Sequence, residues 1–249
     1  MDVEIRIRKG VILAGGTGSR LWPLTEITNK HLLPVYDRPM IDYPLATLKS
    51  LGVEDILIVS GRDHAGDFLE YLGSGFEREL NFHYRVQEKA GGIAEALGLA
   101  REFADGNGVW VILGDNIFDN YFHLPEEFDL NKACLFLKLV ENNRRFGVPV
   151  FDHDRIVEIE EKPEHPKSQF AVTGLYYYPP DVFEMIKNLK PSARGELEIT
   201  DVNNEYAHRD LIQHAKLVEF WSDAGTFDSL AKSVEWAKTE KEKQDGKKI

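Results

Sequence analysis

The sequence has only one cysteine, Cys134, in 249 residues, so it cannot form an intramolecular disulfide. Cys134 lies in the apolar stretch 133–140, which predicts a buried strand residue and not a nucleophile. No apolar run is long enough to cross a bilayer, and residues 1–10 lack the pattern of a secretory leader. These absences predict a soluble, unprocessed protein of the reducing cytoplasm, with no membrane partner.

The sequence also has fewer basic than acidic residues, with 30 Lys and Arg against 42 Asp and Glu, and its formal net charge is −12. This balance argues against nucleic acid or anionic lipid as the main partner, since both favour a basic face. A small anionic substrate remains possible, because it needs only a few cations gathered in one cleft. The eight histidines show neither zinc-ligand nor triad spacing, so no zinc site or triad is predicted.

Apolar runs and helical patterns alternate through the first half of the chain, which indicates a parallel sheet covered on both faces. In the second half, strands follow one another with fewer helices between them. The pattern predicts an α/β protein with a doubly wound, mostly parallel mixed sheet, Rossmann-like, and an additional mixed-strand lobe. Strands are predicted at 10–13, 55–60, 81–87, 109–113, 148–151, 155–160, 172–178 and 216–221, and helices at 40–51, 66–72, 93–103, 200–207 (capped by Thr200) and after Thr226.

A glycine-rich loop follows the first predicted strand, with glycine at positions 15, 16 and 18 and an arginine at position 20. Backbone N–H groups in such a loop can approach phosphate oxygens, and Arg20 can hold them with two hydrogen bonds. A tight turn from strand to helix explains the same glycines equally well.

The loop matches neither common nucleotide fingerprint. It lacks the Lys-Ser/Thr of a P-loop, and Leu21 stands where a dinucleotide-binding loop has its third glycine. The acidic residue nearest to the distance that such a motif requires, Asp37, lies in a proline-flanked loop and not at a strand end. An NAD-linked oxidoreductase is therefore disfavoured.

Two aspartates follow predicted strands, Asp115 after 109–113 and Asp223 after 216–221. Ligands of open α/β sheets bind beyond the carboxyl ends of the strands. A pair of carboxylates completed by phosphate oxygens and water suits Mg²⁺, although a single aspartate at such a position is more often a cap or turn residue. Together they predict a magnesium site.

The segment Glu160-Glu161-Lys162-Pro163 ends the predicted hairpin. Proline restricts this segment, which could direct a carboxylate to a sugar hydroxyl and an ammonium to a phosphate. A solvated charge cluster is the competing interpretation.

Several segments resemble one known family. Residues 13–21 (LAGGTGSRL), 30–35 (KHLLPV), 113–116 (LGDN), 160–163 (EEKP), 195–201 (GELEITD) and 221–226 (WSDAGT) resemble glucose-1-phosphate thymidylyltransferases of the short form, over about residues 10–230. The resemblance implies transfer of a nucleoside monophosphate from dTTP to glucose 1-phosphate. It also implies one domain over 1–249, with a nucleotide part at about 10–120, a sugar part at about 121–235 and a charged helix or tail at 236–249.

The resemblance also implies roles for individual residues. Arg20 and Lys30 would bind the triphosphate, Asp115 and Asp223 would hold Mg²⁺, and Lys162 would bind the sugar phosphate. The expected nucleotide contacts are Gly15, Gly16, Thr17, Gly18, Arg20, Gln87 and Gly92, and the expected sugar contacts are Asn116, Gly147, Glu161, Lys162 and Val172.

The sequence departs from the long bacterial form at His31, at Phe146 and between Gln87 and Gly92. These departures leave transfer from UTP open. The chain ends near the point where the long form adds C-terminal helices, so weak or absent feedback inhibition is expected. A regulatory subunit without activity is disfavoured because the implied cations and carboxylates are all present, and a homo-oligomer is compatible with the sequence.

Overall fold

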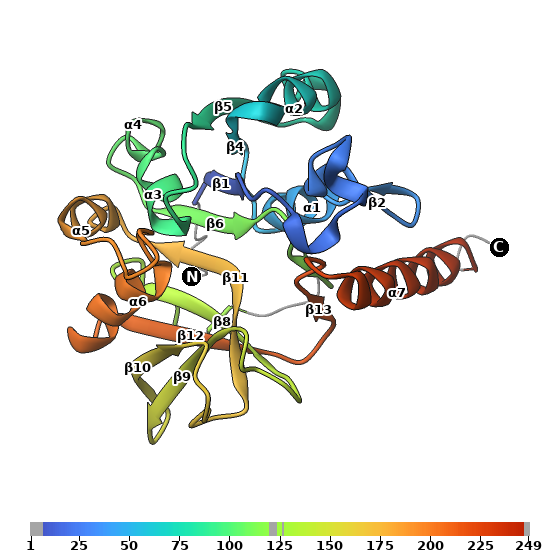
Figure 1. The fold of residues 1–249 in the computed structure, drawn as a ribbon. Helices are drawn as coiled ribbons and strands as arrows, with labels where there is room; N and C mark the ends of the chain where they lie inside the picture. Colours follow the sequence, from blue (N-terminus) through green and yellow to red (C-terminus); the bar gives the residue numbers. More distant parts are fainter. Residues whose placement is uncertain (1–6, 120–123, 126, 247–249) are drawn as a thin grey trace.

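A seven-stranded sheet forms the centre of the molecule in the computed structural model, which describes residues 7–119, 124–125 and 127–246 (Figure 1). The strand order is β12-β8-β11-β6-β1-β4-β5. All strands run parallel except β11, which is antiparallel to both of its neighbours. The strands are β1 (Lys9–Ala14), β4 (Asp55–Gly61), β5 (Asn81–Gln87), β6 (Val109–Leu113), β8 (Ala133–Leu139), β11 (Phe170–Tyr178) and β12 (Ile212–Leu217).

Helices cover both faces of this sheet, because successive strand residues point to opposite sides. Val11 and Leu13 of β1 belong to a core built with α3 to α6, whereas Ile12 and Ala14 belong to a core built with α1 and α2. The predicted fold class is therefore confirmed. The helices are α1 (Asp42–Ser50), α2 (Ala65–Leu72), α3 (Ile93–Gly98), α4 (Arg101–Ala104), α5 (Val182–Asn188), α6 (Ile199–His208) and α7 (Phe227–Gly246).

The separate lobe is smaller than predicted. Only β9 (Gly147–Asp152) and β10 (Arg155–Glu161) form it as an antiparallel hairpin, which packs against α6 at the lower edge of Figure 1. The other strands of the second half, β8, β11 and β12, join the central sheet. Two further pairs of short strands lie outside that sheet: β2 (Pro34–Val35) with β3 (Arg38–Pro39), and β7 (Ile117–Phe118) with β13 (Trp221–Ser222).

The last helix, α7, begins where predicted and extends away from the sheet (Figure 1). The Thr226 hydroxyl accepts from the backbone N–H of Ser229 at 3.3 Å, as an N-cap does. The Trp236 ring stacks on Phe220 with 4.5 Å between ring centres, which packs the middle of the helix against the segment before β13. A charged helix or tail was predicted at 236–249, and α7 continues as a helix through this segment to Gly246, while 247–249 lie outside the described residues. No helix within the described residues is long and apolar enough to span a membrane.

Three predicted elements were wrong in detail. The helix predicted at 93–103 is two helices, because the chain turns after Gly98. Ile186 of α5 packs closely on Gly98, where an added Cβ would lie 3.2 Å from it. Glu198, with extended backbone, is the N-cap of α6, while the Thr200 hydroxyl lies inside the helix and donates to Glu161 instead.

The strand predicted at 216–221 also divides in two. Lys138 Nζ donates to the carbonyls of Val218 and Glu219, at 2.6 Å each, and the chain leaves the sheet there. Asp223 therefore follows the short strand β13 and not the end of a long one.

Candidate functional site

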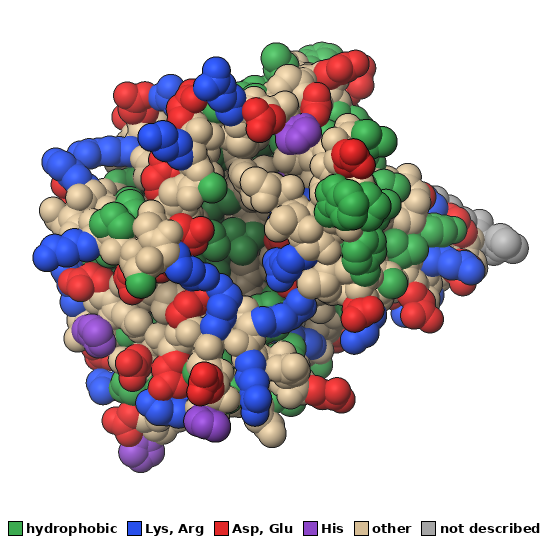
Figure 2. Space-filling view, viewed as in Figure 1, with side chains coloured by type: hydrophobic (Ala, Val, Ile, Leu, Met, Phe, Trp, Pro, Cys, Tyr) green, Lys and Arg blue, Asp and Glu red, His purple; other side chains and the backbone are tan. Residues whose placement is uncertain are grey.

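A cleft of about 490 Å³ opens where the carboxyl ends of β1, β5 and β6 meet the β9–β10 hairpin. Figure 2 shows the hollow at the centre of the face, with basic side chains along its rim. The reversed strand β11 brings its first residues, not its last, to this edge, and Val172 lines the cleft for that reason. The basic residues of the lining are Arg20, Lys30, Arg145, Lys162 and Arg194, and the acidic ones are Asp115, Glu161, Glu196, Glu198 and Asp223.

Asp115 lies directly beyond β6 and forms an ion pair with Lys30. The Lys30 Nζ atom is 2.5 Å from Asp115 Oδ2, and each side chain is only 12% exposed. Burial by itself would raise the pKa of Asp115, but the ammonium of Lys30 outweighs it and the pKa falls to about 2. Asp115 is therefore a carboxylate at every physiological pH.

His31 lies beside this pair and is a buried, uncharged ring. Burial, followed by the charge of Lys30, lowers its pKa to about 3. Its Nδ1 atom is 2.6 Å from Asn29 Oδ1, which leaves Nε2 as an acceptor. The ring packs so closely on Gly114 that a Cβ there would be 2.7 Å from His31 Cδ2. Glycine at position 114 is thus required by packing.

Asp223 faces the same end of the cleft and pairs with Arg145, which comes from the loop before β9. Burial raises the pKa of Asp223 and the charge of Asp115 adds to this, while Arg145 and Arg20 oppose it. A Cβ on Gly225 would lie 3.1 Å from Arg20 and 3.4 Å from Asp115 Oδ2. Gly225 therefore leaves room for Arg20 and the Asp115 carboxylate to approach the backbone that follows Asp223. None of the described residues forms an ion pair with Arg20.

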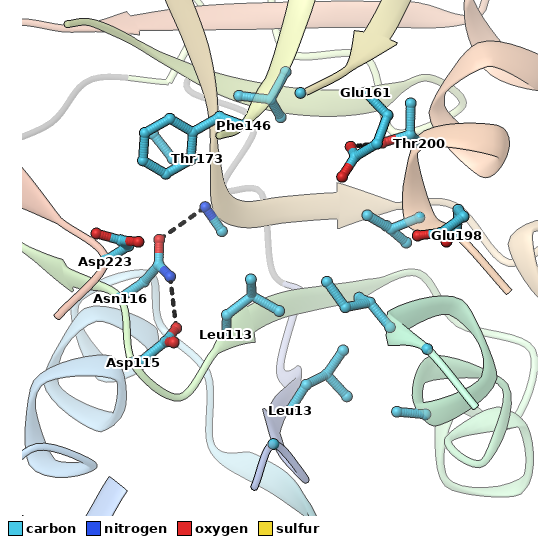
Figure 3. A pocket seen from close by; sticks show the side chains of 18 of the residues that line it. Leu13, Leu113, Asp115, Asn116, Phe146, Glu161, Thr173, Glu198, Thr200 and Asp223 are labelled. Carbon is cyan, nitrogen blue, oxygen red and sulfur yellow. Dashed lines mark hydrogen bonds between the residues drawn. The ribbon is translucent and has the colours of Figure 1, made fainter. Parts of the chain in front are cut away.

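Asn116 ties these groups together and is itself buried (Figure 3). Its Nδ2 donates to Asp115 Oδ1 at 3.0 Å. Its Oδ1 accepts from the backbone N–H of Gly174 at 2.8 Å and from Trp221 Nε1 at 2.7 Å. Asn116 thus orients Asp115 and joins β11 and β13 to it, and one amide proton is left for a ligand.

The donor set suits Mg²⁺. The charge of Asp115 raises the pKa of Asp223, so a divalent cation near both would relieve this repulsion. Among the described residues no three His, Cys, Asp or Glu side chains gather into a metal cage. Magnesium bound by one or two carboxylates takes its remaining ligands from phosphate oxygens and water, so two carboxylates are enough.

The glycine loop contributes Gly15, Gly16 and Arg20 to the lining, but not Thr17 or Gly18. Thr17 is exposed, and Gly18 has a φ of 68° at the start of the single helical turn that carries Arg20. A Cβ on Gly18 would lie 2.7 Å from Thr25 and 3.0 Å from Lys30. Gly18 therefore does not line the cleft itself but allows the loop to adopt its tight conformation against Thr25 and Lys30.

Gln87, the last residue of β5, and Gly92, the N-cap of α3, meet beside Gly15. Gln87 Nε2 donates to the carbonyl of Gly92 at 3.2 Å. The structure thus brings together two of the expected nucleotide contacts, and their role in binding stays a prediction.

The opposite end of the cleft holds Glu161 and Lys162 (Figure 3 labels Glu161). Glu161 Oε2 accepts from Thr200 Oγ1 at 2.6 Å, and Glu161 Oε1 lies 2.9 Å from Lys162 Nζ. Gly147 lies between Glu161 and Val172, where a Cβ would be 3.7 Å from each. Four of the predicted sugar residues therefore gather at one end of the cleft, namely Gly147, Glu161, Lys162 and Val172, whereas Asn116 lies beside Asp115.

Two basic residues of the cleft were not predicted from the sequence, Arg145 and Arg194. Arg194 pairs with Glu198 at 3.0 Å and directly precedes the predicted 195–201 segment, which was the available signal. Arg145 follows another arginine in a loop that has no distinctive pattern. Trp221 opened a predicted segment, but its hydrogen bond to Asn116 could not be foreseen.

Comparison with known proteins identifies relatives over nearly the whole chain. The model of the family described as nucleotidyl transferase matches residues 9–240. A glucose-1-phosphate thymidylyltransferase of Neisseria meningitidis is 42% identical over 93% of this chain and 83% of its own length. One from Actinoplanes is 41% identical over 92% and 78%, respectively.

Solved structures agree with these sequence matches. A Bacillus anthracis structure, described as a candidate glucose-1-phosphate thymidylyltransferase in complex with sucrose, has a TM-score of 0.84 and 48% identity, covering 92% of this chain and 94% of that one. A UDP-glucose pyrophosphorylase complexed with UDP-glucose has a TM-score of 0.80 but only 23% identity, over 94% and 100%, and shows the fold alone.

Proposed function

The chain belongs to the nucleotidyl transferase family, among relatives that are glucose-1-phosphate thymidylyltransferases, and we propose that it transfers thymidylate from dTTP to glucose 1-phosphate. The products are dTDP-glucose and pyrophosphate. The observation that carries the proposal is that Arg20, Asp115 and Asp223 line one cleft, in a chain that is about 40% identical to these enzymes.

The reaction joins two polyanions. An oxygen of the sugar phosphate attacks the α-phosphorus of the nucleotide, and the bond from that phosphorus to the oxygen shared with the β-phosphate breaks, so that this oxygen leaves with pyrophosphate. The barrier consists of repulsion between the anions and of charge that develops on the leaving group. The phosphate monoester is already ionised at neutral pH, so no side chain is needed as a general base.

The cations of the cleft address this barrier. Arg20 and Lys30 would hold the triphosphate and the departing pyrophosphate, and Lys162 with Arg194 would hold the sugar phosphate in line. Asp115 and Asp223 would hold Mg²⁺, which when bound supplies positive charge to the phosphate oxygens. In the structure Lys30, Lys162 and Arg194 are each paired with a carboxylate of the cleft. When the substrates bind, their phosphate groups would replace these carboxylates as partners.

The remaining contacts follow from the two ends of the cleft. Gln87 and Gly92 would bind the pyrimidine edge above Gly15, and Glu161 with the backbone of Gly147 and Val172 would bind sugar hydroxyls. The substrates are small molecules, and the buried thiol of Cys134 is consistent with a cytoplasmic location.

Initial pyrophosphate release tests the proposal, with Mg²⁺, glucose 1-phosphate and each of dTTP, UTP, CTP, ATP and GTP. We expect pyrophosphate release to be fastest with dTTP, and we expect Asp115→Asn to abolish it. A preference for UTP would replace thymidylyl transfer by uridylyl transfer. No release with any nucleotide would contradict the proposal, and other sugar 1-phosphates would then be tried.

A further inference from the structure

The amide group of Gln87 has two different surroundings. Its Nε2 donates to the carbonyl of Gly92 at 3.2 Å and, in a shorter hydrogen bond, to Glu95 Oε2. Its Oε1 lies 2.5 Å from the position that a Cβ on Gly15 would take, and it accepts from none of the described residues. Gln87 therefore turns its carbonyl toward the cleft and its nitrogen toward the protein.

Chemistry fixes this orientation. A backbone carbonyl and a carboxylate can only accept hydrogen bonds, so the atom of Gln87 that faces both must be the NH₂ group. The reversed amide would place Oε1 against two acceptor oxygens and leave both without a donor. One of the two acceptors is backbone, and the other is the Glu95 side chain.

The local fold holds Glu95 in place. Glu95 is the third residue of α3, where a carboxylate also complements the positive end of the helix. Its side chain folds over Gly91, where a Cβ would lie 3.1 Å from Glu95 Cγ. Gly92 has a φ of 99°, and a Cβ there would be 2.4 Å from the carbonyl oxygen of Leu197. Gly91 thus leaves room for the Glu95 side chain, and Gly92 lets the start of α3 pack against the backbone of Leu197.

We propose that Glu95 is a positioning residue that makes the cleft select thymine and uracil over cytosine. The inference rests on the proposed function for its substrate. Thymine and uracil present an N3–H donor beside the O4 acceptor, whereas cytosine presents an N3 acceptor beside its NH₂ group. Gln87 Oε1 accepts from N3–H and repels the cytosine N3. The N–H of Gly92, which donates to none of the described residues, suits O4.

The test compares dUTP with dCTP, which differ only at this edge of the base. Their dissociation constants are measured by calorimetry with Mg²⁺ for the whole protein and for Glu95→Lys, Glu95→Gln and the control Glu102→Lys. Glu95→Lys replaces the acceptor of the shorter hydrogen bond by a donor, which favours the reversed Gln87 amide against the longer hydrogen bond to Gly92, whereas Glu95→Gln retains an acceptor oxygen. Glu102 pairs with Arg85 outside the cleft and gives the same change of charge.

The ratio of dUTP to dCTP affinity should fall about 10-fold or more in Glu95→Lys and stay near wild type in the other two variants. A purely structural role for Glu95 would lower both affinities together and leave the ratio unchanged, which would overturn the inference. A wild-type protein without preference for dUTP would also overturn it.

Pyrophosphate release by the wild type, measured in parallel, separates the two proposals. The expected affinity ratios without turnover would support the role of Glu95 and contradict the proposed function. Turnover with dTTP, together with an unchanged ratio of dUTP to dCTP affinity in Glu95→Lys, would support the proposed function and contradict the role of Glu95.

Discussion

The guanidinium of Arg145 donates to Asp223 Oδ1 at 2.5 Å, so a cation from the loop before β9 neutralises a carboxylate that follows β13. Asp223 is one of the two carboxylates proposed to hold Mg²⁺, and its side chain is only 14% exposed. Arg145 would therefore compete with the proposed metal ion for this carboxylate in the free protein, and metal binding would release it toward phosphate.

Replacing Arg145 by leucine should affect metal binding and turnover in opposite directions. Mn²⁺ should bind the free protein about fivefold more tightly, because a partly exposed ion pair worth ~1 kcal/mol no longer competes. The kcat/KM for pyrophosphate release should fall ~10-fold, since the substrates lose a charged hydrogen bond. Electron paramagnetic resonance of Mn²⁺ and initial rates measure the two effects. Arg144→Leu is the matched control, and weaker Mn²⁺ binding in Arg145→Leu would contradict the competition.

The acid limb of the pH–rate profile should belong to Asp223. Burial raises the pKa of Asp223, whereas the pKa of Asp115 is about 2, so falling pH protonates Asp223 first. Because Arg145 lowers the pKa of Asp223, Arg145→Leu should move the limb to higher pH. Phosphate groups of the substrates titrate with a pKa near ~6 in wild type and variant alike, so the difference between the profiles is the measurement. Identical profiles would assign the limb to another group.

Asp223→Asn and Asp115→Asn should have opposite effects on stability at neutral pH. A raised folded-state pKa means that Asp223 contributes stability at low pH and loses it as pH rises, so Asp223→Asn should raise the melting temperature at pH 7.5. The lowered pKa of Asp115 means that its carboxylate stabilises the fold at neutral pH, so Asp115→Asn should lower it.

Thermal melts without metal measure both effects, and each ~1 kcal/mol corresponds to ~2–4 °C for a chain of this length. The gain in Asp223→Asn should vanish as pH falls below the raised pKa, and the loss in Asp115→Asn should shrink as pH approaches its pKa of about 2. Shifts of the same sign in both variants would contradict the argument.

Trp221→Phe should reduce turnover more than its effect on stability explains. The variant loses the donor to Asn116 Oδ1, at a cost of about 1 kcal/mol, and Asn116 then holds Asp115 less firmly. We expect kcat/KM to fall ~10-fold through poorer positioning. Trp236→Phe, outside the cleft, should lower the melting temperature with kcat/KM unchanged. Equal kcat/KM in wild type and Trp221→Phe would show that Asp115 is positioned without Trp221.

The central sheet and much of the cleft were predictable because they follow from local patterns. Buried strands are continuous apolar runs, and the polar residue after such a run lies at the edge where parallel strands end, as Asp115 does. Asp223 was found by the same rule although its strand had been assigned wrongly. The small residues Ala224 and Gly225 beside it were a sufficient signal of a crowded site.

The other features depend on contacts that sequence spacing does not encode. Arg145 acts through Asp223, 78 residues further along the chain, and no local pattern distinguishes it from Arg144. Thr200 has the sequence of a helix cap, but its hydroxyl is used by Glu161. The reversal of β11 is also not local, because its apolar residues suit a buried strand of either direction.

The position of β11 constrains the order in which the sheet can be completed during synthesis. β6 and β8 are consecutive long strands in sequence, yet they never pair with each other, since β11 lies between them. Until residues 170–178 leave the ribosome, β6 remains an open edge of the half-sheet formed by β1, β4, β5 and β6. The nascent chain thus carries an unpaired edge for the time needed to translate more than fifty further residues, and that interval is when it most needs protection from aggregation.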